Sequence, residues 1–245
     1  MSIEINCDAG EISREIDDAI LPFVGSYNVC CGAHAGDETL IEGTIQKAIE
    51  LGVNVGAHPS WPDRENFGRR SMDLPLDDLR ASLSEQILFV KAIVESNGNR
   101  LQHVKPHGAL YHDVLSNSKI AKLLLEVIFE IDSDLTVYGL AGSTLAESCK
   151  ANGLQFAHEA FGDRRYESAT ELRSRTKRDA LIETEADFCN HVGQLVAGTV
   201  TDIHGETHIL PVQTICLHSD TPNATNFARL AHEILNERNN PTDAG

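Results

Sequence analysis

The stretch Ile3–Cys7 (IEINC), followed by Asp8 and Glu11, contains the pattern that decides the fold. It is a short, mostly apolar run that ends in ionisable residues, and the pattern recurs along the chain. The later runs, each with the polar groups that follow it, are 27–31 with His34 and Asp37, 53–57 with His58 and Asp63, 101–104 with Lys105 and His107, 154–157 with Glu159, Asp163 and Arg164, and 212–217 with His218 and Asp220. Such runs are typical of buried parallel strands.

A barrel of parallel strands explains why ionisable groups recur at the strand ends. In β/α barrels the carboxyl ends of the strands converge on one face, where catalytic groups gather. A further run at 136–140 brings the count to about seven strands, and apolar residues at helical spacing occupy 79–94, 120–131 and 227–235. Strands alternating with helices indicate βαβ units. We therefore predict an α/β fold, a (β/α) barrel of about seven parallel strands with an active site at their carboxyl ends.

Length, charge and cysteine content limit the classes of function. The 245 residues suit one barrel domain, which we expect over 1–238, with a disordered tail over 239–245. The net charge of −17 argues against nucleic acid or an anionic membrane surface as a partner, since both attract basic surfaces. We see no leader peptide and no membrane-spanning stretch. The six cysteines have neither zinc-type nor disulfide-framework spacing, so we expect a cytoplasmic protein.

The most specific single motif is Val104–Tyr111 (VKPHGALY). Pro106 cannot donate to a sheet ladder, so the strand should end there and direct Lys105 and His107 into the barrel mouth. A solvated lysine and a histidine at a helix start are the alternative. His58 also stands directly before a proline, and a buried core histidine is its alternative.

Carboxylates and arginines supply further candidates. Asp8 and Glu11 could act as a general base, a metal ligand or a helix cap, and Asp37 could likewise cap a helix. The segments 66–70 and 161–166 bring arginines into an acidic chain, where they suit carboxylate or phosphate recognition or form surface ion pairs. The sequence contains no Walker loop, no G-x-S-x-G elbow, no H-E-x-x-H pair and no strand-linked G-x-G-x-x-G.

Seven sequence blocks, in this order, resemble the signature blocks of the LamB/YcsF family, to which the 5-oxoprolinase A subunits belong. They are NCDAGE at 6–11, CGAHAGD at 31–37, GAHP at 56–59, FGRR at 67–70, VKPHGALY at 104–111, FGDRRY at 161–166 and CLHSDTP at 216–222. The resemblance implies a seven-stranded barrel related to glycoside hydrolase and metal-dependent deacetylase barrels. It also implies ATP-dependent hydrolysis of the lactam 5-oxo-L-proline to L-glutamate, with ATP converted to ADP and phosphate, normally with two partner subunits. The chain departs from the family at 172–175 (LRSR), although Arg175 is retained.

The implied reaction needs a base for water, an acid for the ring nitrogen, and cations for carboxylate and phosphate. We expect Asp8 or His107 to act as base or acid, Lys105 to stabilise developing negative charge, and Asp163 or Glu159 to orient the cations. The predicted catalytic residues are thus Asp8, Lys105, His107 and Asp163. The predicted substrate- or phosphate-binding residues are Asn6, Glu11, His34, His58, Arg69, Arg70, Glu159, Arg164, Tyr166, His218 and Asp220.

The expected cofactor is ATP with Mg²⁺, bound either by this chain or by one of the partner subunits. Asp8, His58 and His107 have the residue types of an Asp-His-His metal site, as in the related deacetylases. The resemblance to 5-oxoprolinase does not require a catalytic metal, so whether a metal is bound stays open. Two other functions stay open. One is a metal-dependent hydrolase of an acylated sugar that works alone, and the other is a non-catalytic subunit that binds an acidic metabolite.

Overall fold

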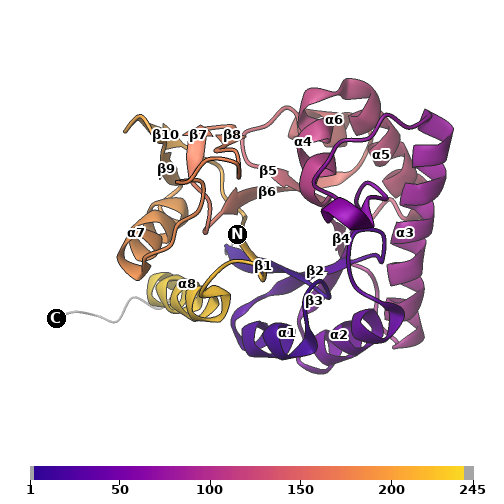
Figure 1. Cartoon of the computed structure of the whole chain (residues 1–245), viewed down its shortest axis with the longest axis horizontal. Helices are drawn as coiled ribbons and strands as arrows, with labels where there is room; N and C mark the ends of the chain where they lie inside the picture. Colours follow the sequence, from indigo (N-terminus) through magenta and orange to yellow (C-terminus); the bar gives the residue numbers. More distant parts are fainter. Residues whose placement is uncertain (1–2, 240–245) are drawn as a thin grey trace.

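The computed structural model describes residues 3–239, and its central feature is a closed barrel of parallel strands. The strands follow the order β1-β11-β6-β5-β4-β3-β2 around the barrel. Their bounds are Glu4–Ala9 (β1), Ser26–Cys30 (β2), Asn54–His58 (β3), His103–Val104 (β4), Thr136–Leu140 (β5), Gln155–Phe161 (β6) and Thr214–His218 (β11). Figure 1 shows these strands as a ring with the helices on its outside. The predicted barrel of about seven parallel strands is confirmed.

Helices connect the strands and cover the barrel. Their bounds are Arg14–Ile20 (α1), Glu38–Glu50 (α2), Leu76–Ser96 (α3), Gly108–Ser116 (α4), Ser118–Ile131 (α5), Leu145–Ala151 (α6), Glu185–Val196 (α7) and Ala224–Asn239 (α8), with 3₁₀ helices at Leu21–Phe23 (η1) and Arg64–Asn66 (η2). The helical spacing predicted for 79–94, 120–131 and 227–235 is confirmed, since these segments lie inside α3, α5 and α8. In α3 the apolar residues, among them Leu83, Ile87 and Val90, are buried on one face, and burial of this face holds the helix in place.

The ends of α2 and α8 bear on two further expectations. Asp37 is the N-cap of α2, because its carboxylate accepts a hydrogen bond from the N–H of Leu40 at 2.9 Å. Asn239, where the predicted tail begins, is the last residue of α8. The rest of that predicted tail, residues 240–245, lies outside the described residues.

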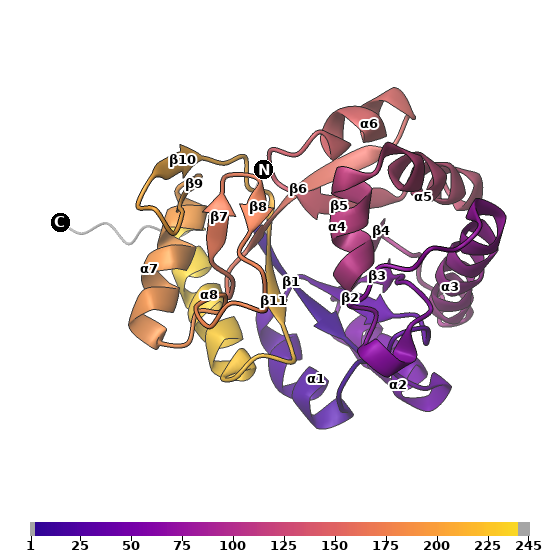
Figure 2. The ribbon, with the colours of Figure 1, turned by 45° about the horizontal axis from the view of Figure 1, so that its top comes forward.

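Two short hairpins that the sequence pattern did not predict lie beside the barrel. Tyr166–Ser168 (β7) pairs with Glu171–Leu172 (β8), and Thr199–Thr201 (β9) pairs with Thr207–Ile209 (β10), both antiparallel. Figure 2 shows β7 and β8 on the same side of the barrel as α7 and the second hairpin. Strands of two or three residues are too short to show an alternating pattern, which is why the sequence did not indicate them.

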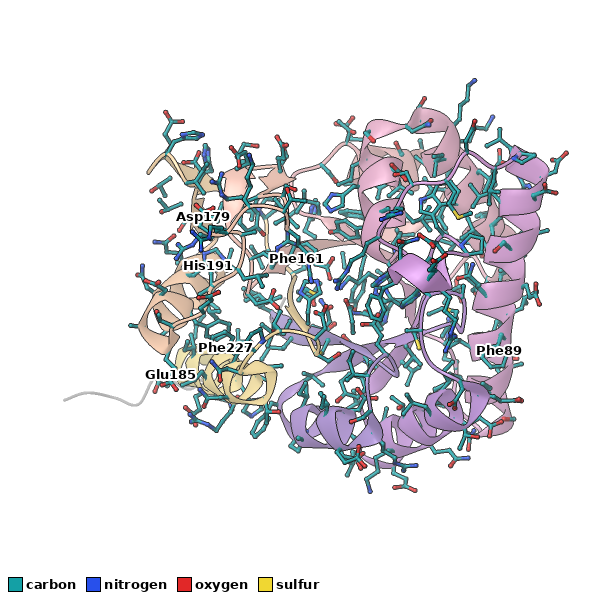
Figure 3. The ribbon with its side chains drawn as sticks, viewed as in Figure 1. Phe89, Phe161, Asp179, Glu185, His191 and Phe227 are labelled. Atoms are coloured by element: carbon teal, nitrogen blue, oxygen red, sulfur yellow. The ribbon has the colours of Figure 1, made fainter. Side chains whose placement is uncertain are left out.

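Side chains fill the ring that looks empty in the ribbon, as Figure 3 shows. A belt of buried polar side chains links four strands below the strand ends. Asn6 donates to Oγ1 of Thr214 at 2.7 Å, Asn28 donates to Oδ1 of Asn6 at 2.7 Å, and Nε2 of His103 lies 2.7 Å from Oδ1 of Asn28. Buried polar groups need such partners. Gly56 leaves room for this belt, because a Cβ there would lie 2.2 Å from the His103 ring.

Two other features bear on the expected setting. The six cysteines are all free in the structure. None of the described helices is both long and apolar enough to cross a membrane.

Candidate active site

Asp8, at the carboxyl end of β1, forms the centre of a buried ionic cluster. Its Oδ1 accepts hydrogen bonds from Nδ2 of Asn28 and Nζ of Lys105, both at 2.8 Å. Burial acts to raise the pKa of Asp8, but His58 and Lys105 hold this pKa well below its usual range. Burial acts to lower the pKa of Lys105, but Asp8 and Glu159, whose Oε1 lies 3.2 Å from Nζ, raise it well above its usual value. The lysine is therefore a fixed positive charge at neutral pH.

Two backbone carbonyls determine which nitrogens of His58 and His107 face the site. Nδ1 of His58 donates to the carbonyl oxygen of Lys105 at 2.6 Å, and Nε2 of His107 donates to that of Phe67 at 2.9 Å. The other two nitrogens, Nε2 of His58 and Nδ1 of His107, lie 3.0 Å apart. In the neutral rings both of these nitrogens carry lone pairs. Phe67 has a left-handed φ of 54°, so its carbonyl depends on a locally strained turn after η2.

Glu11 completes this group from the loop after β1. Its Oε1 lies 3.3 Å from Nδ1 of His107, 3.8 Å from Nε2 of His58 and 2.8 Å from Nε2 of His34. Burial, with a further contribution from Asp8, raises the pKa of Glu11 well above its usual value. His34 stacks on His107 with ring centroids 3.8 Å apart. Glu11 therefore belongs to the buried cluster, and the helix cap considered as its alternative does not apply, since the N-cap of α1 is Ser13.

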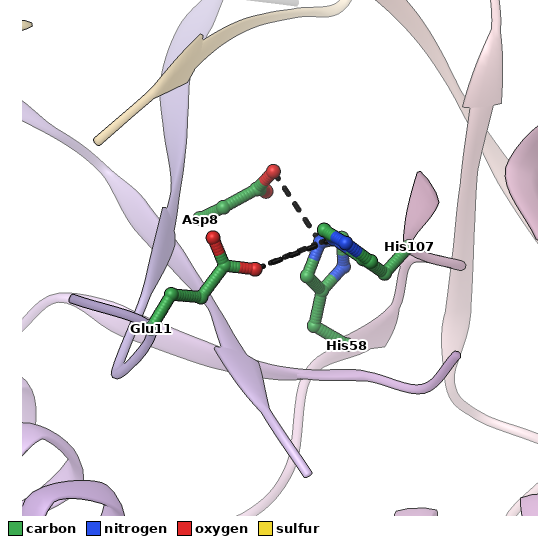
Figure 4. Close-up of side chains that lie close together, drawn as sticks. All are labelled: Asp8, Glu11, His58 and His107. Atoms are coloured by element: carbon green, nitrogen blue, oxygen red, sulfur yellow. Dashed lines mark hydrogen bonds and ion pairs between the residues drawn. The ribbon is translucent and has the colours of Figure 1, made fainter. Parts of the chain in front are cut away.

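The residues Asp8, Glu11, His58 and His107 fit a divalent metal ion. Figure 4 shows their side chains converging on one point, and one donor atom from each lies within 4.8 Å of all the others. Tetrahedral ligands held about 2.1 Å from zinc stand about 3.4 Å from one another. The donor separations of 3.0 Å between the histidines and 3.3 Å from Asp8 to His58 are close to this value. A cation would also remove the repulsion between the two facing lone pairs.

A carboxylate–imidazole pair stands beside this four-donor group. Asp163 accepts from the backbone N–H of His218 at 3.0 Å and lies 3.0 Å from its Nδ1. His218 lowers the pKa of Asp163 despite its burial. With Nδ1 held by Asp163, Nε2 of His218 lies 3.9 Å from Oδ2 of Asp8. Asp163 thus orients a histidine in this structure. From the sequence we had expected Asp163 to orient the lysine and arginine cations of the site instead.

These groups open into one pocket of about 610 Å³ at the barrel mouth. The predicted site residues on its wall are Asp8, His58, Arg69, Lys105, His107, Arg164 and His218. Five other predicted residues contact these wall residues without lining the pocket themselves: Glu11, His34, Glu159, Asp163 and Asp220.

Three more predicted binding residues, Asn6, Arg70 and Tyr166, also do not line the pocket. The amide of Asn6 is used in the polar belt, and the hydroxyl of Tyr166 accepts from the N–H of Phe161. Arg70 is exposed. Direct contact of these three with a substrate in the pocket is therefore not expected.

The structure also adds residues that sequence reasoning did not assign to the site. Arg175, Ser174 and Thr176 reach the pocket from the loop after β8, and His112 reaches it from α4. The arginine retained at position 175 could have indicated that this loop contributes to the pocket. It lies several residues beyond the nearest predicted strand end, however, so the sequence pattern did not place it there.

The blocks that build this site also place the chain among known proteins. A model of the LamB/YcsF family matches residues 3–243. The chain belongs to the LamB/YcsF family. The resemblance of its sequence blocks is thereby confirmed.

Two of the relatives illustrate how much of the chain is matched. The 5-oxoprolinase A subunit of Bacillus cereus is 41% identical over 244 residues, which cover 97% of this chain and 96% of that protein. The crystal structure of a lactam utilization protein from Thermus thermophilus has a TM-score of 0.89 and 32% identity, with 98% of each chain covered. A putative cellobiose-phosphate cleavage protein from Enterococcus faecalis, at a TM-score of 0.56 and 11% identity over 96% of this chain and 90% of that one, shares the fold alone.

Proposed function

We propose that this chain is the A subunit of an ATP-dependent 5-oxoprolinase, which opens the lactam of 5-oxo-L-proline to L-glutamate in the cytoplasm together with two partner subunits. The proposal rests mainly on one observation, which is that three groups of ionisable side chains meet at one pocket. These are the four-donor group around Asp8, the charged Lys105, and the Asp163–His218 pair. The names of the relatives, a 5-oxoprolinase A subunit and a lactam utilization protein, support lactam chemistry.

The proposed reaction balances with one ATP and two waters. The γ-phosphoryl group of ATP, supplied with Mg²⁺ at this chain or at a partner, transfers to the ring carbonyl oxygen and turns an unreactive amide into an activated imidate. Water then adds to the ring carbon and gives a proton to a base. The C–N bond breaks as the nitrogen takes a proton, and a second water releases phosphate, leaving glutamate.

The pocket residues supply the groups that these steps need. His218 can accept and return a proton at Nε2, because Asp163 holds its Nδ1. Asp8, kept ionised by Lys105 and His58, is the second candidate for the base. Lys105 would stabilise negative charge on the tetrahedral adduct. A divalent ion held by Asp8, Glu11, His58 and His107 would polarise a bound oxygen.

The test is ATP-dependent release of glutamate from 5-oxoproline by the chain together with the proteins that co-purify with it. We expect activity in the assembly, and a loss of about 100-fold or more in Asp8→Asn and His218→Asn, the usual loss for a general acid or base. Glu50→Gln, at an exposed end of α2, is the matched control and should keep full activity. Thermal unfolding of each variant separates lost chemistry from lost folding.

The four-donor group also favours a second candidate, a metal-dependent hydrolase of an acylated sugar. That enzyme would work without ATP and without partners. Release of acetate from acetylated chitooligosaccharides by the chain alone with Zn²⁺, and no glutamate from any assembly, would replace our proposal. Normal glutamate release by an assembly that carries Asp8→Asn would instead indicate a non-catalytic binding subunit.

A further inference from the structure

Arg164 is a buried cation on the pocket wall that makes no close ion pair with a carboxylate of the described residues. Its residue is only 4% exposed. Nη2 donates to the carbonyl oxygen of Arg173 at 2.6 Å, while Nε is buried with no hydrogen-bond partner among the described residues. Among residues 3–239, no aspartate or glutamate oxygen lies within 4.0 Å of its guanidinium nitrogens, and Asp163 acts on it only over a longer distance. Burying an unpaired charge is costly, so such a group is normally matched by a ligand or partner when the protein works.

Arg175 lies on the same wall, and it shares its carboxylate partner with another arginine. Its Nη1 donates to Oδ2 of Asp220 at 3.2 Å, and this carboxylate also pairs with Arg69. One carboxylate therefore serves two guanidinium groups. The side chain of Arg175 is 27% exposed and lines the pocket, so it can reach a ligand there.

The two arginines are electrostatic neighbours. Burial and Arg175 lower the pKa of Arg164 to about 10, although Asp163 acts to raise it. The pKa of His112, another wall residue, is lowered by burial and by both arginines. The two guanidinium groups therefore lie close together on a wall that also carries the exposed Glu171.

We propose that Arg164 and Arg175 form a receptor for a compact oxyanion of the substrate. This rests on the proposed function for the identity of the ligand, which is the carboxylate of 5-oxoproline or the phosphoryl group of its activated form. Guanidinium groups bind such oxyanions through paired, charge-assisted hydrogen bonds. If the oxyanion binds to these arginines, the lactam ring would lie next to Asp8 and His218, which line the same pocket. The receptor would therefore select lactams that carry an acidic group.

The test is calorimetric titration of the full chain with three probes. These are 5-oxoproline, 2-pyrrolidinone, which is the same ring without the carboxylate, and inorganic phosphate. We expect Arg164→Gln and Arg175→Gln to weaken binding of 5-oxoproline by about 10- to 100-fold, as for loss of a charge-assisted hydrogen bond, and to leave the weak binding of 2-pyrrolidinone unchanged. Arg70→Gln, an exposed arginine off the pocket wall, is the control and should bind like the wild type.

The outcomes separate the two sources of the oxyanion. Arginine-dependent binding of phosphate without binding of 5-oxoproline assigns the receptor to the phosphoryl group. The proposal is overturned if neither anion binds the wild type, if 2-pyrrolidinone binds as tightly as 5-oxoproline while phosphate does not bind, or if Arg175→Gln binds both anions like the wild type. If Arg164→Gln does not fold, the partly exposed Arg175 decides the question alone.

Turnover by the assembly distinguishes failure of the receptor from failure of the proposed function. Glutamate release with an unchanged KM in Arg175→Gln would remove the receptor and keep the function. Arginine-dependent anion binding in an assembly that never forms glutamate would keep the receptor and remove the function.

Discussion

At the scale of a residue, Asp17 couples pH to the stability of the loop that carries Glu11. Its Oδ2 accepts from the N–H of Gly10 at 2.8 Å and from the hydroxyl of Thr44 at 2.9 Å. Burial raises the pKa of Asp17 to about 6. The folded chain thus holds this proton more tightly than the unfolded chain does, whose aspartates titrate near about 3.9. The contribution of this carboxyl to the free energy of unfolding falls as pH rises from about 4 to about 6, and it stays lost above.

Asp17→Asn should remove this pH dependence. Relative to the wild type, the free energy of unfolding of the variant should rise by about 2 to 3 kcal/mol between pH 4 and pH 7, at about 1.4 kcal/mol for each unit of pKa shift. Urea unfolding of both proteins across this range measures the difference and cancels the other titrating groups. A constant difference would show that Asp17 titrates normally.

At the scale of an element, β3 depends on the absence of a side chain at Gly56. His103 crosses from β4 over this position to reach Asn28 on β2, and a Cβ at Gly56 would lie 2.2 Å from the ring. Gly56→Ala should therefore displace His103, break the polar belt and lower the free energy of unfolding by about 1–3 kcal/mol or more. Gly193→Ala in α7 is the control, because a Cβ there meets nothing within 4 Å and alanine favours a helix. Equal urea midpoints for the two variants would contradict this account.

At the scale of the whole molecule, the four-donor group exists only in the folded chain. Its members come from β1, the loop after β1, β3 and the segment before α4, so a metal ion bound there stabilises the folded state against unfolding. After chelator treatment, Zn²⁺ at about 100 times its dissociation constant should add about 2.7 kcal/mol, which is a rise in Tm of several degrees. His58→Asn should lose this rise. His208→Asn, in the separate Asp202, Glu206 and His208 group, should keep it. A Tm that Zn²⁺ does not change would argue against the site.

The sequence by itself determined the barrel and pointed to most residues of the candidate site. Buried parallel strands must be apolar along their length, and their ends meet on one face, so the runs before Asp8, His58, Lys105 and His218 predicted both the strands and the convergence. Helical spacing in 79–94 likewise predicted α3, because periodic burial is a local property of the chain.

Only the tertiary structure decided which groups face one another. The tautomers of His58 and His107 follow from the carbonyls of Lys105 and Phe67, which lie on other segments. Loop dihedrals and long-range packing place Arg175 in the pocket and leave Arg70 outside it. The direction of a side chain at a strand end depends on contacts between residues far apart in the chain, and no periodicity in one sequence records these contacts.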